Sequence, residues 1–299
     1  MKLVLTGTGT SHGVPVIGCD CKVCTSTDPR DNRMRCGAWI FEPASILIDV
    51  GPEFRIQALR HGIRNLDAVL ITHSHADHLH GIDDLRVFSH TRSFDGGNVP
   101  KDNETKGDGL RIYSTSKSTR DITHRFDYIF KPVKEGGGKP KIKMDSIEQF
   151  SEKNPLVVKG VEIVPVMLKH GSLDDAGYMF TQTYGGKKHS IAYLTDCSFI
   201  DENSFALLER NRENLEYLVI DGLREKMHST HFSFDQALEA ANRIGARNTY
   251  LIHMSHDLSH VEIERYVDDR IEKYPNLAKA RKSGGYVGPA WDGLVLETE

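Results

Sequence analysis

Four residues with side chains that bind metal ions occur within one short segment, His73-Ser74-His75-Ala76-Asp77-His78. The apolar run at 68–72 directly before it predicts a buried strand. Side chains two positions apart face the same way at a strand end, so His73 and His75 can share one cation, and a helix beginning near Asp77 would place Asp77 and His78 at an adjacent point. Imidazole and carboxylate suit Zn²⁺, Mn²⁺ or Fe²⁺. The segment therefore predicts two neighbouring metal sites rather than a solvated histidine-rich turn.

The His-x-His-x-Asp-His spacing resembles that of the metallo-β-lactamase-fold hydrolases, and the resemblance extends over nearly the whole chain. It implies an α/β fold, an αββα sandwich of two mixed sheets packed face to face with outer helices, formed by residues 1–299 as a single domain. It also implies three further ligands after apolar runs: His170 for the first site, Asp196 as the bridging carboxylate and His253 for the second site. Independently of the family, a histidine or aspartate that closes an apolar run suits a metal at the rim of a sheet. Asp49 is a candidate to orient a ligand histidine or to cap a helix.

Three of the five cysteines crowd into Cys19-Asp20-Cys21-Lys22-Val23-Cys24. An odd number of cysteines in a reducing compartment argues against a disulfide framework and for thiolate ligation of a metal. Three thiolates would form a tetrahedral Zn²⁺ site that lacks one ligand, with a redox role as the alternative. His256 follows His253 by three positions, so one loop can serve both the active-site metals and this structural zinc.

The cysteine cluster strengthens a second resemblance, to the phosphoribosyl 1,2-cyclic phosphate phosphodiesterases of phosphonate degradation. The matching stretches are Thr6-Gly7-Thr8-Gly9, Gly13-Val14-Pro15, Gly18 to Cys24, and the pair His253 and His256. This resemblance implies that Cys19, Cys21, Cys24 and His256 hold the structural zinc. It also implies that a histidine between the bridging aspartate and the last ligand acts near the leaving group.

Two histidines compete for the role near the leaving group, His228 and His231. We favour His231 because it stands just before Ser233, the predicted N-cap of a helix, as the corresponding histidine does in the enzymes that the chain resembles. Asp221, which closes the run at 217–220, either orients His231 or caps a turn.

The predicted function follows from the metal sites. Two divalent ions, Zn²⁺ or Mn²⁺, about 3.5–4 Å apart would share a bridging hydroxide and neutralise charge on a phosphoryl group. We expect a metal-dependent phosphoric diester hydrolase that acts on a small, cyclic ribose-type phosphodiester, with His231 and Asp77 as its catalytic side chains. The alternatives are a tRNA 3′-processing endonuclease and a non-hydrolytic cofactor-biosynthesis protein of the same fold, similar to that of pyrroloquinoline quinone synthesis. A β-lactamase or lactonase is disfavoured by Asp77 and by the Cys/His zinc site.

Composition restricts the partners. Lys and Arg number 38 against 42 Asp and Glu, a net charge of −4. A broad cationic surface for nucleic acid is therefore not expected, which disfavours the tRNA alternative without excluding it. No apolar run approaches the roughly 20 residues of a membrane-spanning helix, and the N-terminus has no secretory pattern. We therefore expect a cytoplasmic protein with no membrane partner, and a homodimer, as is usual among similar proteins.

The elements that must position these residues alternate between strands and helices. Strands are predicted at 3–6, 46–50, 68–72, 161–168, 191–195, 217–220 and 249–252. Ser233 begins a capping box before a helix that Gly245 ends, and Gly185-Gly186 predicts a hairpin turn. Surface insertions are expected near 93–109 and 134–143, since both lack apolar anchors. His12 lies in the glycine-rich first loop, where we favour a surface position over one that lines the cleft. Without a spacing argument we expect solvent-facing or structural roles for His80, His90, His124, His189 and His260, and burial of the thiols of Cys36 and Cys197.

Overall fold

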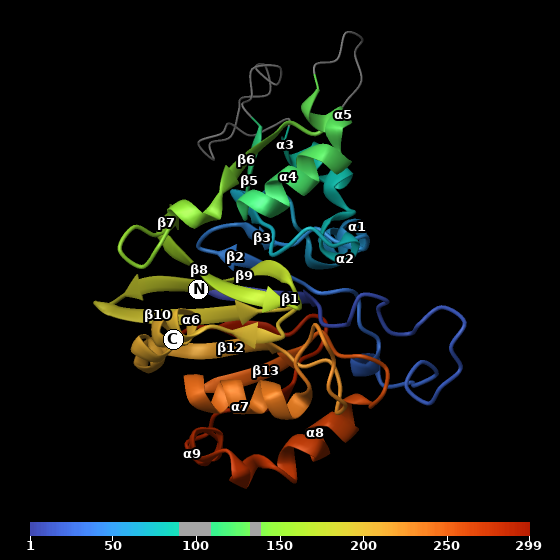
Figure 1. Cartoon of the computed structure of the whole chain (residues 1–299), viewed down its shortest axis with the longest axis vertical. Coiled ribbons are helices and arrows are strands. Elements are labelled where there is room, and N and C mark those ends of the chain that lie inside the picture. The colour runs from blue at the N-terminus through green and yellow to red at the C-terminus, as the bar shows by residue number, and fades with distance from the viewer. Residues whose placement is uncertain (90–108, 132–138) are drawn as a thin grey trace.

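The apolar runs of the sequence form the central strands of two β-sheets. The computed structural model describes residues 1–89, 109–131 and 139–299, and within these ranges one sheet has seven strands and the other has eight. The sheets lie face to face, with helices on both outer sides (Figure 1). This arrangement confirms the predicted αββα sandwich.

The first sheet is antiparallel on one side and parallel on the other. β1, β2 and β3 pair antiparallel, whereas β3, β4, β5 and β6 run parallel. In spatial order its strands are β15 (Val295–Glu297), β1 (Lys2–Gly7), β2 (Gly37–Glu42), β3 (Ile46–Ile48), β4 (Ala68–Leu70), β5 (Leu110–Ser114) and β6 (Ile142–Ser146).

The second sheet repeats this mixed pattern. β8, β9 and β10 pair antiparallel, whereas β10, β12, β13 and β14 run parallel. The carboxyl ends of parallel strands meet at one edge of a sheet, which is where ligands are bound in α/β proteins. The strands in spatial order are β11 (Phe199–Ile200), β8 (Val161–His170), β9 (Leu173–Tyr184), β10 (Lys187–Leu194), β12 (Leu215–Asp221), β13 (Asn248–Ile252) and β14 (Val287–Pro289), with β7 (Leu156–Val158) paired to β8.

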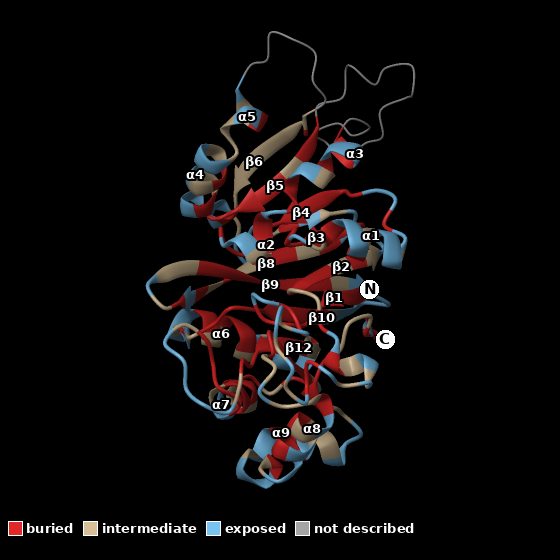
Figure 2. Ribbon diagram, turned by 90° about the vertical axis from the view of Figure 1, so that its right-hand side faces the viewer, coloured by how far each residue is buried: buried red, intermediate tan, exposed pale blue. Residues whose placement is uncertain are grey.

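Three apolar clusters hold the layers together. One lies between the sheets, and one lies under the helices on each outer side. Figure 2 shows the strands mostly buried and the exposed residues mainly on the helices and loops. The first sheet is covered by α1 (Phe54–His61), α2 (Ala76–Leu79), α3 (Arg86–Ser89), α4 (Ser116–Arg125) and α5 (Asp127–Phe130), and the second by α6 (Glu202–Arg210), α7 (Phe234–Ile244), α8 (His260–Asp268) and α9 (Pro275–Lys282). Each helix within the described ranges is too short or too polar to cross a membrane.

The structure confirms each predicted strand and shortens two of them. β4 ends at Leu70 rather than at residue 72, because the N–H of Thr72 donates to the Asp49 side chain instead of to a strand partner. β3 likewise ends at Ile48, and Asp49 follows it with a left-handed φ of 62°. The capping box of Ser233 and the left-handed Gly245 bound α7 as predicted.

The two predicted insertions fall largely outside the described residues. Residues 93–108 and 134–138 belong to those undescribed stretches, so nothing tests their structure. Residues 142 and 143 of the second predicted range belong to β6 (Ile142–Ser146). Ile142 already pairs with Leu110 in the parallel ladder of β6 with β5, so the segment becomes a strand at residue 142.

Candidate dinuclear metal centre

The segment that carries the predicted ligands is fixed by both sheets. The N–H of Thr72 donates to Asp49 Oδ1 at 2.8 Å, and its carbonyl accepts from the N–H of Ala176 in β9 at 3.2 Å. The hydroxyl of Tyr178, also in β9, donates to the carbonyl of Ile71 at 2.7 Å. The backbone that leads into the ligands is therefore held from two directions.

The first group of ligand atoms comes from three histidines, His73, His75 and His170. One ring nitrogen of each lies within 4.8 Å of the others. The Nδ1–H of His170 donates to the carbonyl of Thr230 at 2.7 Å, which leaves its Nε2 lone pair available to a metal. His75 is the exposed member, so the group is open to solvent on its side.

The second group adjoins the first and consists of Asp77, His78, Asp196 and His253. The Nε2 of His78 lies 3.2 Å from one oxygen of Asp77 and 3.2 Å from one oxygen of Asp196, and the Nε2 of His253 lies 3.2 Å from the other oxygen of Asp196. Asp196 also lies within 4.8 Å of His170. Its carboxylate therefore stands between the two groups, where a bridging ligand is required.

Buried nitrogens without partners test whether metals fit these groups. Within the described part of the chain, the Nε2 atoms of His73, His78 and His253 have no hydrogen-bond partner although they are fully buried. Such atoms are costly unless something binds them. Imidazole nitrogens and carboxylate oxygens are the donor set of divalent zinc, manganese and iron. The residues therefore fit two divalent cations, and the role of each residue as a ligand stays a prediction.

The electrostatics of the two histidines nearest the centre differ. Burial lowers the pKa of His73 well below its usual value, and His78 adds to that effect. Burial also acts on His78, but Asp196, Asp49 and Asp77 together outweigh it and raise the pKa of His78 well above its usual value. Burial thus favours neutral His73, whereas a cation that binds at His78 would have to displace a proton.

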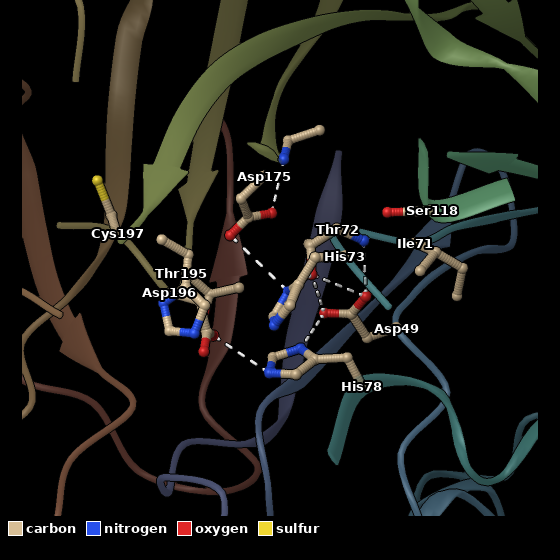
Figure 3. Close-up of polar contacts among 12 residues, drawn as sticks. Asp49, Ile71, Thr72, His73, His78, Ser118, Asp175, Thr195, Asp196 and Cys197 are labelled. Atoms are coloured by element: carbon tan, nitrogen blue, oxygen red, sulfur yellow. Dashed lines mark hydrogen bonds and ion pairs between the residues drawn. The ribbon is translucent and has the colours of Figure 1, made fainter. Parts of the chain in front are cut away.

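The Asp49 side chain links the two groups of potential ligands through hydrogen bonds. Its Oδ2 accepts from the Nδ1–H of His78 at 2.7 Å, and both of its oxygens accept from the Thr72 hydroxyl at 3.0 and 3.1 Å. The Thr72 hydroxyl oxygen lies 3.1 Å from His73 Nδ1. Of the two roles expected for Asp49, the structure shows the contact that orients a histidine (Figure 3).

The backbone supports this arrangement with unusual conformations. Asp49, Asp196 and His253 have positive φ values of 62°, 52° and 59°. The three residues follow β3, β10 and β13, and non-glycine residues rarely adopt this region. The left-handed turn directs each side chain out of its strand's alternation, towards the shared edge.

The cysteine cluster forms a separate site at the N-terminal loop. The Sγ atoms of Cys19, Cys21 and Cys24 each lie 3.4 Å from His256 Nδ1. A hydrogen bond from the N–H of Cys24 is the main cause that lowers the pKa of Cys21 to about 6, whereas burial raises the pKa of Cys24 to about 11. Three thiols around one imidazole fit a tetrahedral zinc ion. The structure thus brings together the four predicted residues, and the zinc itself stays a prediction.

The two histidines that competed for the leaving-group role lie in different surroundings. His231 is buried, its Nδ1–H donates to Asp221 Oδ2 at 3.0 Å, and its Nδ1 lies 4.0 Å from Asp196. His228 is exposed, and its Nδ1 lies 3.1 Å from the Thr230 hydroxyl oxygen. Only His231 of the two belongs to a potential ligand cluster within the described residues. The geometry favours His231, and Asp221 orients it.

The remaining residues of the sequence interpretation belong to none of the potential ligand clusters among the described residues. His12, His80 and His124 are exposed, His189 is half-buried beside Glu216, and His260 is fully buried; His90 lies outside the described residues. Cys36 and Cys197 are buried, as predicted, and burial raises the pKa of both thiols well above its usual value.

Sequence reasoning missed three groups that support the centre. Asp175 in β9 is fully buried, and its Oδ2 lies 3.8 Å from His73 Nδ1. Asp121 and Arg125 in α4 bind Ser74, the residue between the first two ligand histidines. An acidic residue inside the apolar strand β9 was the one signal available for Asp175, whereas no sequence pattern marks the contacts of α4.

The family follows from comparison with known proteins. The beta-lactamase superfamily domain matches residues 44–254 of the chain. A solved structure described as a new diphosphatase from the PhnP family is 35% identical, with 100% of this chain and 98% of that chain covered and a TM-score of 0.76. The chain therefore belongs to the beta-lactamase superfamily and, within it, to the PhnP family. This membership and the clusters above support metal-dependent hydrolysis as the chemistry of the chain.

Two further relatives are informative in a more limited way. Zn²⁺-bound PqqB from Methylobacterium extorquens is 16% identical, with 99% of this chain and 100% of that chain covered and a TM-score of 0.69, which shows a shared fold alone. An octanoyltransferase of Porphyromonas gingivalis (strain ATCC BAA-308 / W83) is 35% identical over 259 residues, 86% of this chain. The chain spans about half the length of that curated relative, 46%.

Proposed function

We propose that this metal-dependent hydrolase is a phosphodiesterase that acts on a small, cyclic ribose-type phosphodiester. The observation that carries the proposal is the pair of His231 and Asp221 beside a complete set of seven potential ligands. Bound divalent ions would acidify a water molecule and neutralise charge on a phosphoryl oxygen. The similarity to a PhnP-family diphosphatase supports phosphorus as the reaction centre.

The residues of the chain divide the work between binding and proton transfer. Asp77 and Asp196 supply the negative charge that holds two cations close together, and the open side at His75 admits the substrate. Because the Nδ1–H of His231 is held by Asp221, the Nε2 of His231 is the atom that can give a proton to the departing oxygen. Asp221 stabilises the protonated imidazole in this role.

Octanoyl transfer, the activity named for the longer relative, is not proposed for this chain. An acyl transfer through a thioester requires a reactive thiolate. The two cysteines nearest the centre, Cys36 and Cys197, are buried, and their pKa values are raised well above the usual range. The chain also corresponds to less than half of that relative.

The test is a substrate panel with the purified protein loaded with Mn²⁺ or Zn²⁺. The panel contains 1,2- and 2′,3′-cyclic ribose phosphates, bis-p-nitrophenyl phosphate, a precursor tRNA with a 3′ trailer and an octanoyl thioester. We expect the cyclic phosphates to be cleaved fastest and His75→Ala or Asp196→Ala to abolish turnover. His124→Ala, an exposed histidine outside the clusters, is the matched control and should retain full activity. Unchanged turnover in both site variants, or far faster cleavage of the tRNA, would refute the proposal.

A further inference from the structure

β9 carries a fully buried acidic residue, Asp175, within its apolar part. The Oδ1 of Asp175 accepts from the N–H of Ala176 at 2.6 Å, whereas its Oδ2 has no hydrogen-bond partner in the described part of the chain. A buried carboxylate oxygen without a partner is costly unless a nearby donor or charge compensates it. The group that Oδ2 faces is therefore the one to consider.

The Oδ2 of Asp175 faces the first ligand histidine from the second sheet. It lies 3.8 Å from His73 Nδ1, and within the described ranges no other carboxylate forms an ion-pair contact with His73 (Figure 3). The N–H of Ala176 donates to the carbonyl of Thr72 at 3.2 Å, and the hydroxyl of Tyr178 holds the preceding carbonyl. These bonds join β9 to the backbone that leads into His73, so the main chain sets the approach of Asp175.

The group that faces Nδ1 decides which nitrogen of His73 can bind a metal. Ligation through Nε2 requires the proton on Nδ1, and the Nε2 of His73 is buried without a partner among the described residues. The Thr72 hydroxyl oxygen also lies near Nδ1, at 3.1 Å, but a hydroxyl can either donate or accept. An ionised carboxylate can only accept, so Asp175 is the group that can keep the proton on Nδ1.

The charge of Asp175 complements the first group of ligands. The three histidines of that group bring no negative charge of their own, whereas the second group contains Asp77 and Asp196. Burial, followed by the charge of Asp196, raises the pKa of Asp175 well above its usual value, so its ionised form requires positive charge nearby. A divalent cation bound at His73 would supply that charge. Asp175 and this cation would therefore stabilise each other.

We propose that Asp175 is a positioning residue of the first metal site, where its carboxylate holds the Nδ1–H of His73 and directs Nε2 to the cation. The inference rests on the metal centre of the proposed function and makes its first site dependent on a residue of the second sheet. Asp49 has the same relation to His78 in the second group, through a contact of 2.7 Å. Each group then has a histidine backed by a buried aspartate, an arrangement that strengthens histidine ligands in metal sites.

Asp175→Asn tests the inference, because asparagine keeps the shape of the side chain and removes its charge. Its amide oxygen would stay with the Ala176 N–H, so its NH₂ group would face His73 Nδ1 and favour the proton on Nε2. We expect the affinity of the first site to fall about 10–100-fold. The probe is Mn²⁺, with the free ion measured by electron paramagnetic resonance, since thiolates prefer softer metals and the cysteine cluster then contributes little.

A His75→Ala background separates an effect on the first site from a general one. His75 is exposed and belongs to the first group only. In this background a single Mn²⁺ ion should bind at the second site, and the addition of Asp175→Asn should change its affinity by less than about twofold. An equal loss in both backgrounds would show an effect on the fold or on overall charge and would overturn the inference. Unchanged Mn²⁺ binding in Asp175→Asn alone would overturn it as well.

Asp174→Asn is the matched control and should bind both ions like the wild type. Asp174 precedes Asp175 in β9, its side chain faces the other side of the strand, and it pairs with Lys169 at the surface. Asp175→Ser, a smaller neutral variant, repeats the measurement if circular dichroism shows that Asp175→Asn does not fold. A wild-type protein that binds two Mn²⁺ ions but cleaves no phosphodiester would refute the proposed function alone, and a loss confined to the first site would still support the role of Asp175.

Discussion

Replacement of Asp49 by Asn tests the hydrogen bonds that link Asp49 to His78 and, through Thr72, to His73. The substitution replaces one carboxylate oxygen with an NH₂ group. Asp49 is 2% exposed and accepts hydrogen bonds from the Thr72 N–H, the Thr72 hydroxyl and His78 Nδ1. Asparagine keeps the shape and tolerates the left-handed φ of 62°. Its amide oxygen must stay with the Thr72 N–H, whose position is fixed, so its NH₂ group faces His78.

The expected result is a loss of metal affinity in the second group of ligands. An NH₂ group facing Nδ1 favours the His78 tautomer with its proton on Nε2, the atom that would bind the metal. Loss of such a supporting contact weakens metal binding about 10–100-fold, or roughly 1.4–2.7 kcal/mol. Asp49→Ala is less informative, since it strands three buried donors at about 1–3 kcal/mol each.

Competition for Zn²⁺ with a chromophoric chelator measures the two affinities, and thermal melting followed by circular dichroism checks the fold. Thr72→Val removes the hydroxyl that joins Asp49 to His73 and leaves the contact between Asp49 and His78 in place, so it should weaken the first group more than the second. Asp67→Asn is the matched control, because Asp67 is a buried aspartate at the opposite end of β4, where it accepts from the Ser45 N–H at 2.8 Å. If Asp49→Asn binds two metals as tightly as the wild type, the tautomer argument is wrong.

Three further results are expected. Cys21→Ser should lose one zinc equivalent and lower the melting temperature while the dinuclear centre still loads; a normal zinc count by elemental analysis would contradict the structural site. His231→Ala should reduce turnover about 10²–10⁴-fold with unchanged metal content, as for loss of a general acid, and the same fall in His228→Ala instead would transfer the role. Burial, with Arg30 and Arg33, lowers the pKa of His260 from 6.5 to about 4, so folding stability is complete above pH 6.5 and falls by up to about 3 kcal/mol as pH drops to 4. Urea melts at pH 7 and pH 4.5 should show that His260→Leu lacks this component, and equal pH dependence in both proteins would disprove it.

Local sequence patterns were sufficient for the main elements of the fold. The helix after Ser233 has its cap, its apolar spacing and its terminating glycine within one short segment, and the structure reproduces all three. The strands that end near ligands were found because each is a continuous apolar run. β5 was not singled out, because parallel pairing with strands far along the chain, rather than any local turn, defines it.

The sequence predicted those site residues whose type is unusual at the end of an apolar strand. Histidines and aspartates after apolar runs stand out, and the structure brings all seven predicted ligands together. Asp175 and Arg125 did not stand out, because each acts through a contact with a distant segment. Asp175 reaches His73 from the other sheet, and Arg125 reaches Ser74 from a helix. Such contacts depend on how layers pack, which local patterns do not encode.

Residues with a left-handed backbone explain why the sequence predicts the site residues correctly but places the ends of the preceding strands less well. In an ordinary strand, Asp49, Asp196 and His253 would continue the alternation of faces, and their side chains would point into or away from the core. Instead, each lies just beyond the end of its strand and has a positive φ, a conformation that costs about 1–3 kcal/mol for a non-glycine residue. For Asp49 the three hydrogen bonds it accepts offset this strain. For Asp196 and His253 we expect a bound cation to offset the strain, because their side chains belong to one potential ligand cluster. An apolar run therefore predicts where a buried strand stops, but it does not predict the left-handed residue that follows.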